Sequence, residues 1–292
     1  MIRAVGGAGY ADAFGRQWQR YRRTQLDSYT GLPISRTRLR RCVGDAHWGE
    51  LPDALVLEAG CGAGRFTEVL LGERARVVSV DLSEAVVANA ANFPISDRHA
   101  VVRADITDLP FEGGQFDFVM CIGVLQHTPD PVRTIAALVA QLRPGGVLVV
   151  DQYSRDKVGY ASLKPVYRGL LKRLPPGRAL PLVERLTALF LPLHAMCAGN
   201  RALWFALTRV SPLITYHRDM PELSPAQQRE WAALDSHDAL TDWYKHPTDA
   251  PALRRTLERA GLSDIVVRDG GIGVEARAVR PVAAVAGVQA PR

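Results

Sequence analysis

The stretch "VLEAGCGAGRF", residues 56–66, is the most informative part of this sequence for predicting its fold. An apolar run that is typical of a buried strand passes directly into glycines at every second position, Gly60, Gly62 and Gly64. Glycine lets a backbone approach a ligand without a Cβ in the way. Since ligands of open α/β sheets bind beyond the carboxyl ends of the strands, the stretch predicts a binding loop at such an end.

The sequence around this loop alternates short apolar runs with helical periods. Strands are expected at 54–58, 75–81, 99–105, 116–122 and 145–153, and helices at 65–71, 83–93 and 131–142. Strands that are apolar throughout are buried on both faces, as in parallel sheets between two helical layers. The pattern therefore predicts an α/β fold with a doubly wound, seven-stranded and mostly parallel sheet, the last two strands coming from the region described next.

The segments on either side of this pattern predict further domains. Helices are expected at 10–27 and 34–46, then a largely helical insert between strands 5 and 6, and finally a helix at 249–261 with strands at 264–271 and 273–279. The expected organisation is an N-terminal helical lid (1–50), a Rossmann-like domain (51–152 and 248–280), an acceptor-binding insert (153–247) and a flexible tail (281–292).

Charge and cysteine usage restrict the classes of function. The net charge is +5 over residues 1–50, −6 over 51–152 and +7 over 153–292, so the expected ligand-binding core is acidic and a nucleic-acid partner is not favoured. The four cysteines show no CxxC pair, and we expect neither a disulfide framework nor a metal site. The first residues lack the apolar run of a signal peptide, which predicts a cytoplasmic protein.

The polar residues after the strands indicate which ligand the loop holds. A dinucleotide loop would carry glycine where Arg65 stands, and a phosphate loop would need a Gly-Lys-Ser/Thr sequence. Asp81 ends the second strand, where an acid can accept both hydroxyls of a ribose, and Asp105 follows the third strand. Acids without a phosphate-binding lysine fit a nucleoside that has ribose and adenine but no phosphate, and S-adenosylmethionine is such a molecule. The alternative is that both acids only cap their strand ends.

Five segments in order resemble the motifs of class I S-adenosylmethionine-dependent methyltransferases: "VLEAGCGAGRFT", "VVSVDLSEAVV", "VRADITDLPF", "FDFVMCIGVLQHTPDP" and "LRPGGVLVVDQY". The resemblance implies S-adenosylmethionine as cofactor and an antiparallel seventh strand. It also implies the cofactor-binding residues Glu58, Gly60, Cys61, Gly62, Gly64, Arg65, Asp81, Leu82, Asp105, Ile106 and Cys121. In this set Glu58 orients the loop from below, and backbone near Cys121 takes the amino group. Arg65 either reaches the cofactor carboxylate or is a solvated residue of the first helical turn.

The loop after the fourth strand provides a candidate base. "GVLQHTPDP" is similar to the His-bearing loop of natural-product sugar O-methyltransferases, which implies catalytic roles for His127 and for Asp151 at the end of the next strand. Deprotonation of a hydroxyl acceptor is worth about 10² to 10⁴ in rate. Gln126 stands where those enzymes carry a second His, and a hydrogen bond that only stabilises the loop is the alternative role of His127.

Acceptor specificity is expected from outside the sheet. Trp18 and Tyr21 lie on an aromatic stripe at helical spacing, which either packs the core or closes over the cofactor as a lid. The segment "LDSHDALTDWYKHP" combines acids with aromatic rings, a composition that suits a sugar or amino-sugar or, alternatively, a solvated helix end. The candidate acceptor-binding residues are His217, Asp235, His237, Asp238 and Tyr244.

Three functions remain open at this level. The first is methyl transfer to a hydroxyl or amine of a polar small molecule such as a sugar, amino-sugar or other secondary metabolite. The second is methylation of a nucleic acid, but the sequence lacks the Asn/Asp-Pro-Pro-Tyr/Phe signature of enzymes that methylate base amines. The third is a peripheral membrane protein that docks through the basic and apolar stretch 157–197 and reaches a lipid-linked acceptor or acts without catalysis. We expect a monomer or a homodimer.

Overall fold

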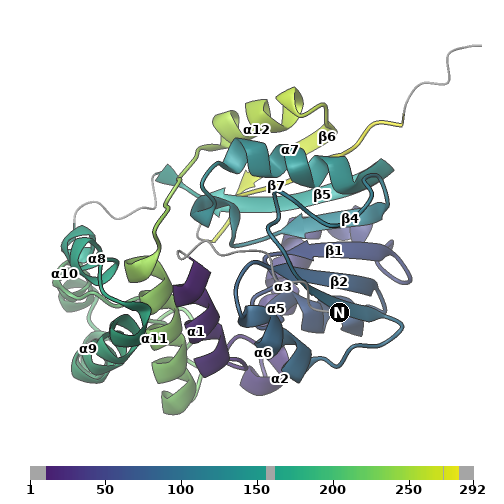
Figure 1. Ribbon diagram of the computed structural model, residues 1–292. Helices are drawn as coiled ribbons and strands as arrows, with labels where there is room; N and C mark the ends of the chain where they lie inside the picture. The colour runs from purple at the N-terminus through teal and green to yellow at the C-terminus, as the bar shows by residue number, and fades with distance from the viewer. Residues whose placement is uncertain (1–10, 156–161, 272, 283–292) are drawn as a thin grey trace, which may run out of the picture.

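The fold is a seven-stranded sheet between two helical layers, with a helical cap at the carboxyl ends of the strands (Figure 1). A computed structural model describes residues 11–155, 162–271 and 273–282. The strands are β1 (Leu55–Ala59), β2 (Arg76–Asp81), β3 (His99–Arg103), β4 (Phe116–Cys121), β5 (Leu142–Tyr153), β6 (Ser263–Asp269) and β7 (Gly273–Val279).

The strand order is β3-β2-β1-β4-β5-β7-β6, with β7 antiparallel to both of its neighbours and the other pairs parallel. From β1 the strand order runs through β2 to β3 at one edge, and β4 and β5 then lie on the other side of β1. Open sheets of this kind bind their ligands at the point where the strand order reverses. The predicted seven-stranded, mostly parallel fold is confirmed, and it places the glycine loop at this switch point.

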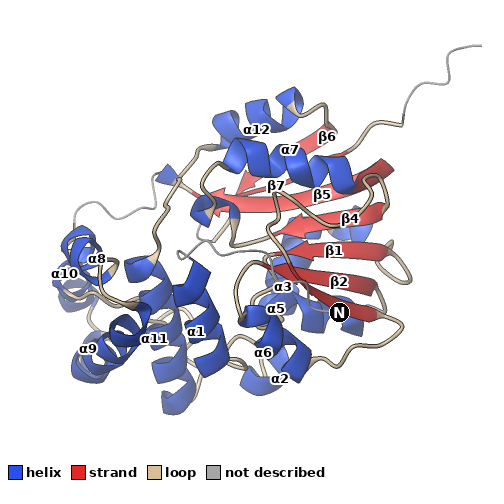
Figure 2. Ribbon diagram, in the orientation of Figure 1, coloured by secondary structure: helices blue, strands red, loops and turns tan. Residues whose placement is uncertain are grey.

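Alternate residues of the central strands pack into two separate cores. Leu57 and Val119 face the layer of α7 (Pro131–Gln141) and α12 (Ala250–Arg259). Val56 and Phe118 face the opposite layer, which contains α3 (Ile34–Val43), α4 (Asp45–Trp48) and α5 (Arg65–Gly72). Figure 2 shows α7 and α12 on one side of the strands and α3 and α5 on the other. Burial of apolar residues on both faces explains the continuously apolar strands.

The first helices are shorter than the sequence predicts. The helix expected over 10–27 is α1 (Asp12–Arg20), followed by turns and by the short α2 (Asp27–Thr30). The turns carry the side chains of Thr24 and Gln25 toward the insert, where they donate hydrogen bonds to Glu230 and Asp235 at 3.0 Å each. The helix therefore ends early because its continuation packs on a different part of the chain.

The insert consists of α8 (Lys164–Leu171), α9 (Pro176–Cys197), α10 (Arg201–Val210) and α11 (Pro225–Thr241). α11 begins with a capping box in which Ser224 and Gln227 satisfy each other's backbone groups. α1 packs against α9 and α11, so the N-terminal segment and the insert form one layer, which we call the cap (α1 and α8–α11). The helix α6 (Ala85–Asn92) joins α1 to the sheet. Residues 283–292 of the predicted tail lie outside the described residues.

Candidate active site

The glycine loop between β1 and α5 is shaped by close packing. Gly60, Gly62 and Gly64 all have positive φ, at 80°, 53° and 101°, which disfavours any residue with a Cβ. A Cβ on Gly60 would lie 2.3 Å from Val124, and one on Gly62 would lie 3.1 Å from the Trp18 indole. Gly60 and Gly62 therefore present bare backbone to the space above the strands.

Two predicted cofactor residues support this loop from behind. A Cβ on Gly64 would meet Phe93 of the α6 C-terminus at 2.5 Å, so this glycine serves packing and does not line the cavity. Glu58 lies below the loop and accepts hydrogen bonds from Thr67 at 2.5 Å and Ser79 at 3.0 Å. Burial raises the pKa of Glu58 to about 7. Gly64 is thus corrected from ligand contact to loop packing, whereas Glu58 lies where the resemblance implies, below the loop.

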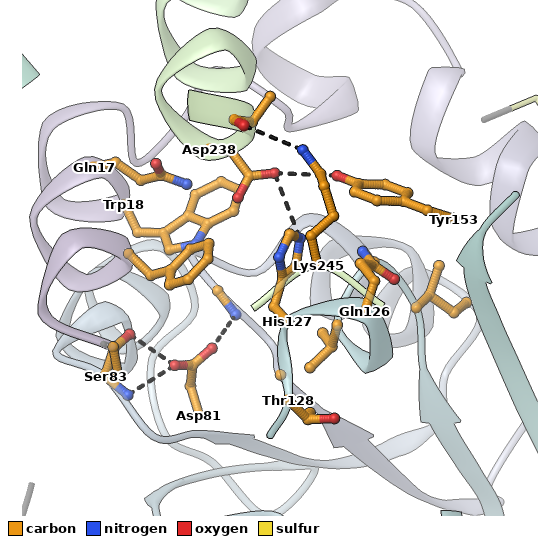
Figure 3. A pocket seen from close by; sticks show the side chains of 18 of the residues that line it. Gln17, Trp18, Asp81, Ser83, Gln126, His127, Thr128, Tyr153, Asp238 and Lys245 are labelled. Carbon is orange, nitrogen blue, oxygen red and sulfur yellow. Dashed lines mark hydrogen bonds and ion pairs between the residues drawn. The ribbon is translucent and has the colours of Figure 1, made fainter. Parts of the chain in front are cut away.

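The acid at the end of β2 lies beside the loop. Asp81 accepts hydrogen bonds from the Gly62 amide at 3.0 Å and from the Ser83 amide and hydroxyl at 2.9 and 2.7 Å (Figure 3). Burial raises its pKa. Asp105 uses one oxygen, Oδ1, to hold the Thr107 amide and hydroxyl at 2.8 and 2.7 Å. The strand-end acids therefore have capping bonds, and both also line the cavity.

These residues form one end of a single cavity of about 1280 Å³. The predicted residues Cys61, Arg65, Leu82 and Ile106 line this end together with Gly60, Gly62, Asp81, Asp105 and Trp18. Cys121 is fully buried behind the wall, which Ile122 and Gly123 form instead. The cavity exceeds the usual range of small-molecule pockets, about 300 to 1,000 Å³, and so has room for a cofactor and a second molecule.

Arg65 is a cation inside this cavity. Its Nε donates a hydrogen bond to Ser35 at 3.1 Å, and its guanidinium lies over the rings of Phe66 and Trp231 at 5.3 and 5.8 Å. Among the described residues, no carboxylate forms a salt bridge with it, and burial lowers its pKa to about 10. A buried cation that lacks a carboxylate partner is suited to an anionic group of a ligand.

The loop after β4 brings His127 to the opposite end of the cavity. Its ring is buried between Phe14 and Tyr153, with ring centroids at 5.3 and 5.5 Å. Nε2 lies 3.8 Å from Asp238 and Nδ1 lies 3.5 Å from Asp242, and neither nitrogen has a hydrogen-bond partner among the described residues. Figure 3 shows His127 between Asp238 and Tyr153, across the cavity from Asp81.

Two cations and a phenol complete this end. Lys245 and Arg168 pair with the fully buried Asp242 at 3.3 and 2.5 Å, and the Tyr153 hydroxyl donates to Asp238 at 3.5 Å. Burial raises the pKa values of Asp238 and Tyr153. His127 can therefore accept a proton from a bound hydroxyl, because the carboxylates of Asp238 and Asp242 lie near its ring.

Asp151 does not reach this group, and its predicted catalytic role requires correction. Its carboxylate forms a salt bridge with Arg38 of α3 and accepts a hydrogen bond from the Gly123 amide at 2.5 Å. It is 4% exposed and does not line the cavity. Asp151 therefore fixes the turn after β4, and the sequence could not show the Arg38 partner because it comes from the N-terminal segment.

Asp235 anchors a second polar group on α11. It accepts hydrogen bonds from Gln25 and Trp231 at 3.0 and 3.2 Å and from the Tyr216 hydroxyl. Burial raises the pKa of Asp235 to about 6. Asp235 and Tyr216 both line the cavity, so this group faces the same space as His127.

Four of the predicted lid and acceptor residues lie outside the cavity lining. Tyr21 turns toward α9 and donates a hydrogen bond to Glu184 at 2.7 Å, and His237 is buried against Gln17 at 2.5 Å. Tyr244 stacks on His246 at a centroid distance of 6.0 Å, and His217 is partly exposed. Of the predicted lid and acceptor residues, only Trp18, Asp235 and Asp238 line the cavity.

Sequence reasoning missed several cavity residues. Tyr153 ends β5, and a polar residue at a strand end is a signal that could have found it. The other missed residues depend on how the N-terminal helices and the insert pack: Phe14, Gln17, Arg38, Lys164, Arg168, Tyr216 and Lys245. Among the described residues, no three His, Cys, Asp or Glu side chains meet in an arrangement that could hold a metal ion.

A family model described as a methyltransferase domain matches residues 57–150, which contain the glycine loop, both strand-end acids and His127. This part of the chain is therefore similar to methyltransferase domains. The prediction of a class I S-adenosylmethionine-dependent methyltransferase domain, with S-adenosylmethionine as its cofactor, is confirmed at this level.

The relatives extend beyond the methyltransferase domain to different degrees. An uncharacterized protein of Synechococcus sp. is 28% identical over 235 residues, which cover 76% of this chain and 50% of that protein. A ubiquinone biosynthesis O-methyltransferase of Xanthomonas campestris is 32% identical over 133 residues, covering 44% of this chain and 54% of the relative. This chain thus spans about half the length of these curated relatives.

A solved structure shares the fold over the whole chain. A putative S-adenosylmethionine-dependent methyltransferase of Methanococcus maripaludis aligns with a TM-score of 0.50 at 12% identity, covering 98% of this chain and all of that one. The likeness supports the sheet with its added cap as one architecture.

Proposed function

We propose that the protein transfers a methyl group from S-adenosylmethionine to a hydroxyl of a polar small molecule, with an amine as the alternative acceptor. The observation that carries the proposal is the position of His127. Its two ring nitrogens lack hydrogen bonds among the described residues, and the residue lines the same cavity as the glycine loop. A buried polar group without a partner is a place where a ligand can supply the missing bond.

The cofactor end fits S-adenosylmethionine in its residue chemistry. Gly60 and Gly62 leave room for the methionine portion beside the backbone, and Asp81 is placed for the ribose hydroxyls. Asp105 offers its Oδ2 to the adenine amine, and Arg65 offers its unpaired charge to the methionine carboxylate. When bound, S-adenosylmethionine supplies an electrophilic methyl group on a sulfonium.

The residues of the chain then have to orient the acceptor and move one proton. Alignment of two reactants can supply roughly 7 to 11 kcal/mol, and a base about 10² to 10⁴ in rate. His127 takes the proton of the acceptor hydroxyl at one ring nitrogen. The carboxylates of Asp238 and Asp242 stabilise the resulting imidazolium from 3.8 and 3.5 Å.

The polar groups around His127 favour an acceptor with several hydroxyls. Asp235 and Asp238 provide hydrogen-bond acceptors, while Lys164 and Lys245 provide donors. This composition suits a sugar, an amino-sugar or another polar metabolite. The name of the Xanthomonas relative, an O-methyltransferase, supports oxygen as the atom that is methylated.

The test combines cofactor binding with turnover. We expect calorimetry to show binding of S-adenosylhomocysteine, and mass spectrometry to show a gain of one methyl group on a hydroxylated acceptor from a panel of sugars and phenols. His127→Ala should lower kcat by about 10² or more and leave the cofactor dissociation constant unchanged. His47→Ala, at a partly exposed histidine outside the cavity, is the matched control. A near-normal rate in His127→Ala would remove the base role, and failure to bind S-adenosylhomocysteine would remove the whole proposal.

A further inference from the structure

Three consecutive helices of the insert expose apolar side chains. Ten of the sixteen exposed large hydrophobic residues that the structure describes lie between residues 163 and 210. They belong to α8, α9 and α10 or directly precede α8, at the end of the molecule away from the sheet (Figure 1). Concentrations of exposed apolar residues of this kind mark interaction sites.

α9 has two faces that differ in burial. Val183, Leu191 and His194 are buried on its inner side, where α9 packs against α11. Leu189 and Met196 are 64% and 81% exposed on its outer side. The outer apolar residues recur at 182, 189, 193 and 196, which keeps them on one stripe of the helix.

α9 is apolar in composition but little buried in the fold. Residues 177–197 are long and apolar enough to cross a membrane by length and composition, yet only 28% of the most apolar window is buried in the fold. A core helix of this composition would be mostly buried. Because α9 is fixed along one side to α1 and α11, it can contact a bilayer only with its outer side, parallel to the surface.

The charges of the same segment have one sign. Residues 162–218 contain nine lysines and arginines and one acid, Glu184. Glu184 is already paired, because it accepts hydrogen bonds from Tyr21 and Arg20 of the N-terminal segment. Arg185 and Arg201 are exposed beside the apolar stripe. A basic helix with an exposed apolar face fits a surface of anionic lipids.

We propose that the face formed by α8, α9 and α10, the docking face, binds the surface of an anionic lipid bilayer. A second copy of the chain is the less suitable occupant. In a two-fold dimer the same patch meets itself, so the arginines of one docking face would meet those of the other without an acid to pair with them. A bilayer supplies both hydrocarbon for the stripe and phosphate for the arginines.

Docking would place the cavity beside the bilayer. α8 contributes Lys164, Pro165 and Arg168 to the cavity wall, while Val166 and Leu170 of the same helix are 60% and 66% exposed on the docking face. The docking proposal does not depend on methyl transfer, because it concerns the outer side of these helices.

Vesicle co-sedimentation of the full chain tests the proposal. The vesicles are phosphatidylcholine alone or phosphatidylcholine mixed equally with phosphatidylglycerol, at low and at high salt. We expect sedimentation with the mixed vesicles at low salt and weaker binding at high salt, where the charges are screened. Absence of binding at low salt, or equal binding to both vesicle types, would overturn the proposal.

Two sets of variants locate the binding surface. Leu189→Ser with Leu193→Ser and Met196→Ser should weaken binding to mixed vesicles by at least about tenfold. The matched control changes Val87, Ile95 and Val132, which are also exposed but lie on the sheet domain, to serine. Equal losses in both sets, or none in the first, would overturn the proposal. Unchanged circular dichroism and S-adenosylhomocysteine binding confirm that each variant is folded.

A charge pair gives a second, independent readout. Arg185→Gln with Arg201→Gln should remove most of the salt dependence, whereas Arg254→Gln with Arg255→Gln on α12 should keep it. Light scattering then separates lipid from self-association. A wild-type dimer that becomes monomeric in the apolar variant, with no vesicle binding by either, would overturn the proposal in favour of a second copy.

Discussion

The sheet domain and the cap build the two ends of one cavity by different means. The cofactor end uses backbone: two glycines with positive φ, held by Val124 and Trp18. The acceptor end uses side chains, most of which come from the cap and its flanks, with Asp235 and Asp238 among them. Cofactor binding therefore depends on free space beside fixed backbone positions. Acceptor binding depends instead on charged side chains, which substitutions in the cap can change without altering the backbone of the sheet domain.

The largest expected effect comes from the buried charge at the end of α11, which pairs with α8 and with the segment after α11. Asp242→Ala leaves Arg168 and Lys245 without their partner and should lower the free energy of unfolding by about 3 kcal/mol. Chemical denaturation monitored by circular dichroism measures it. Asp219→Ala, at an exposed acid of the same insert, should change little. Equal stability of Asp242→Ala and wild type would show that the cap is not held by charge.

The next effect concerns the backbone-built end. Gly60→Ala places a Cβ 2.3 Å from Val124 at a φ of 80° and should weaken cofactor binding by about 100-fold, or ~2.7 kcal/mol. Calorimetry with S-adenosylhomocysteine gives the dissociation constant. Gly31→Ala is the matched control, because its φ is 73° but no atom lies within 4 Å of the added Cβ. The same loss in both variants would mean that strain, and not the space at Val124, causes the effect.

The smallest effect is a pH dependence that belongs to the cap. Burial lowers the pKa of His194 and of His237 from 6.5 to about 4. Because the unfolded chain binds these protons first, the stability is fully present above pH 6.5 and is lost as the pH falls toward 4. The expected loss is on the order of 1 kcal/mol per histidine, which is smaller than either effect above.

Denaturation of wild type and of the double variant His194→Gln with His237→Gln measures this dependence at several pH values. The double variant should lose less stability between pH 6.5 and pH 4 than wild type does. Parallel curves for the two proteins would contradict the assignment of the pH dependence to these side chains.

The sheet domain could be predicted because its determinants are local. Each strand is an apolar run of a few residues, and β1–β2, β2–β3, β4–β5 and β6–β7 are pairs of consecutive strands. The binding loop and the acid Asp81 follow strands directly, so strand prediction places them at one edge. Gly64 and Cys121 were assigned to the ligand by motif, and only the packing shows that they lie behind the cavity wall.

The cap could not be predicted in the same way because its contacts join distant segments. The hydrogen bond between His237 and Gln17 spans 220 positions and buries two polar side chains that would be solvated on an isolated helix. No periodicity distinguishes such a residue from a surface one, and α11 carries buried residues on most of its sides. His237 was therefore predicted as an acceptor ligand, while Tyr216 and Lys245 were missed.

The position of β7 has a consequence for the order in which the chain is made. β7 lies between β5 and β6, yet it is synthesised after the whole insert. While the ribosome makes the cap, β5 has one open edge, with backbone groups available to other strands. The glycine loop, Asp81 and His127 emerge earlier, so the cofactor side can assemble before the sheet is closed. Pairing of β7 with β5, and not completion of the cofactor loop, is thus the step at which this edge stops being a risk for aggregation.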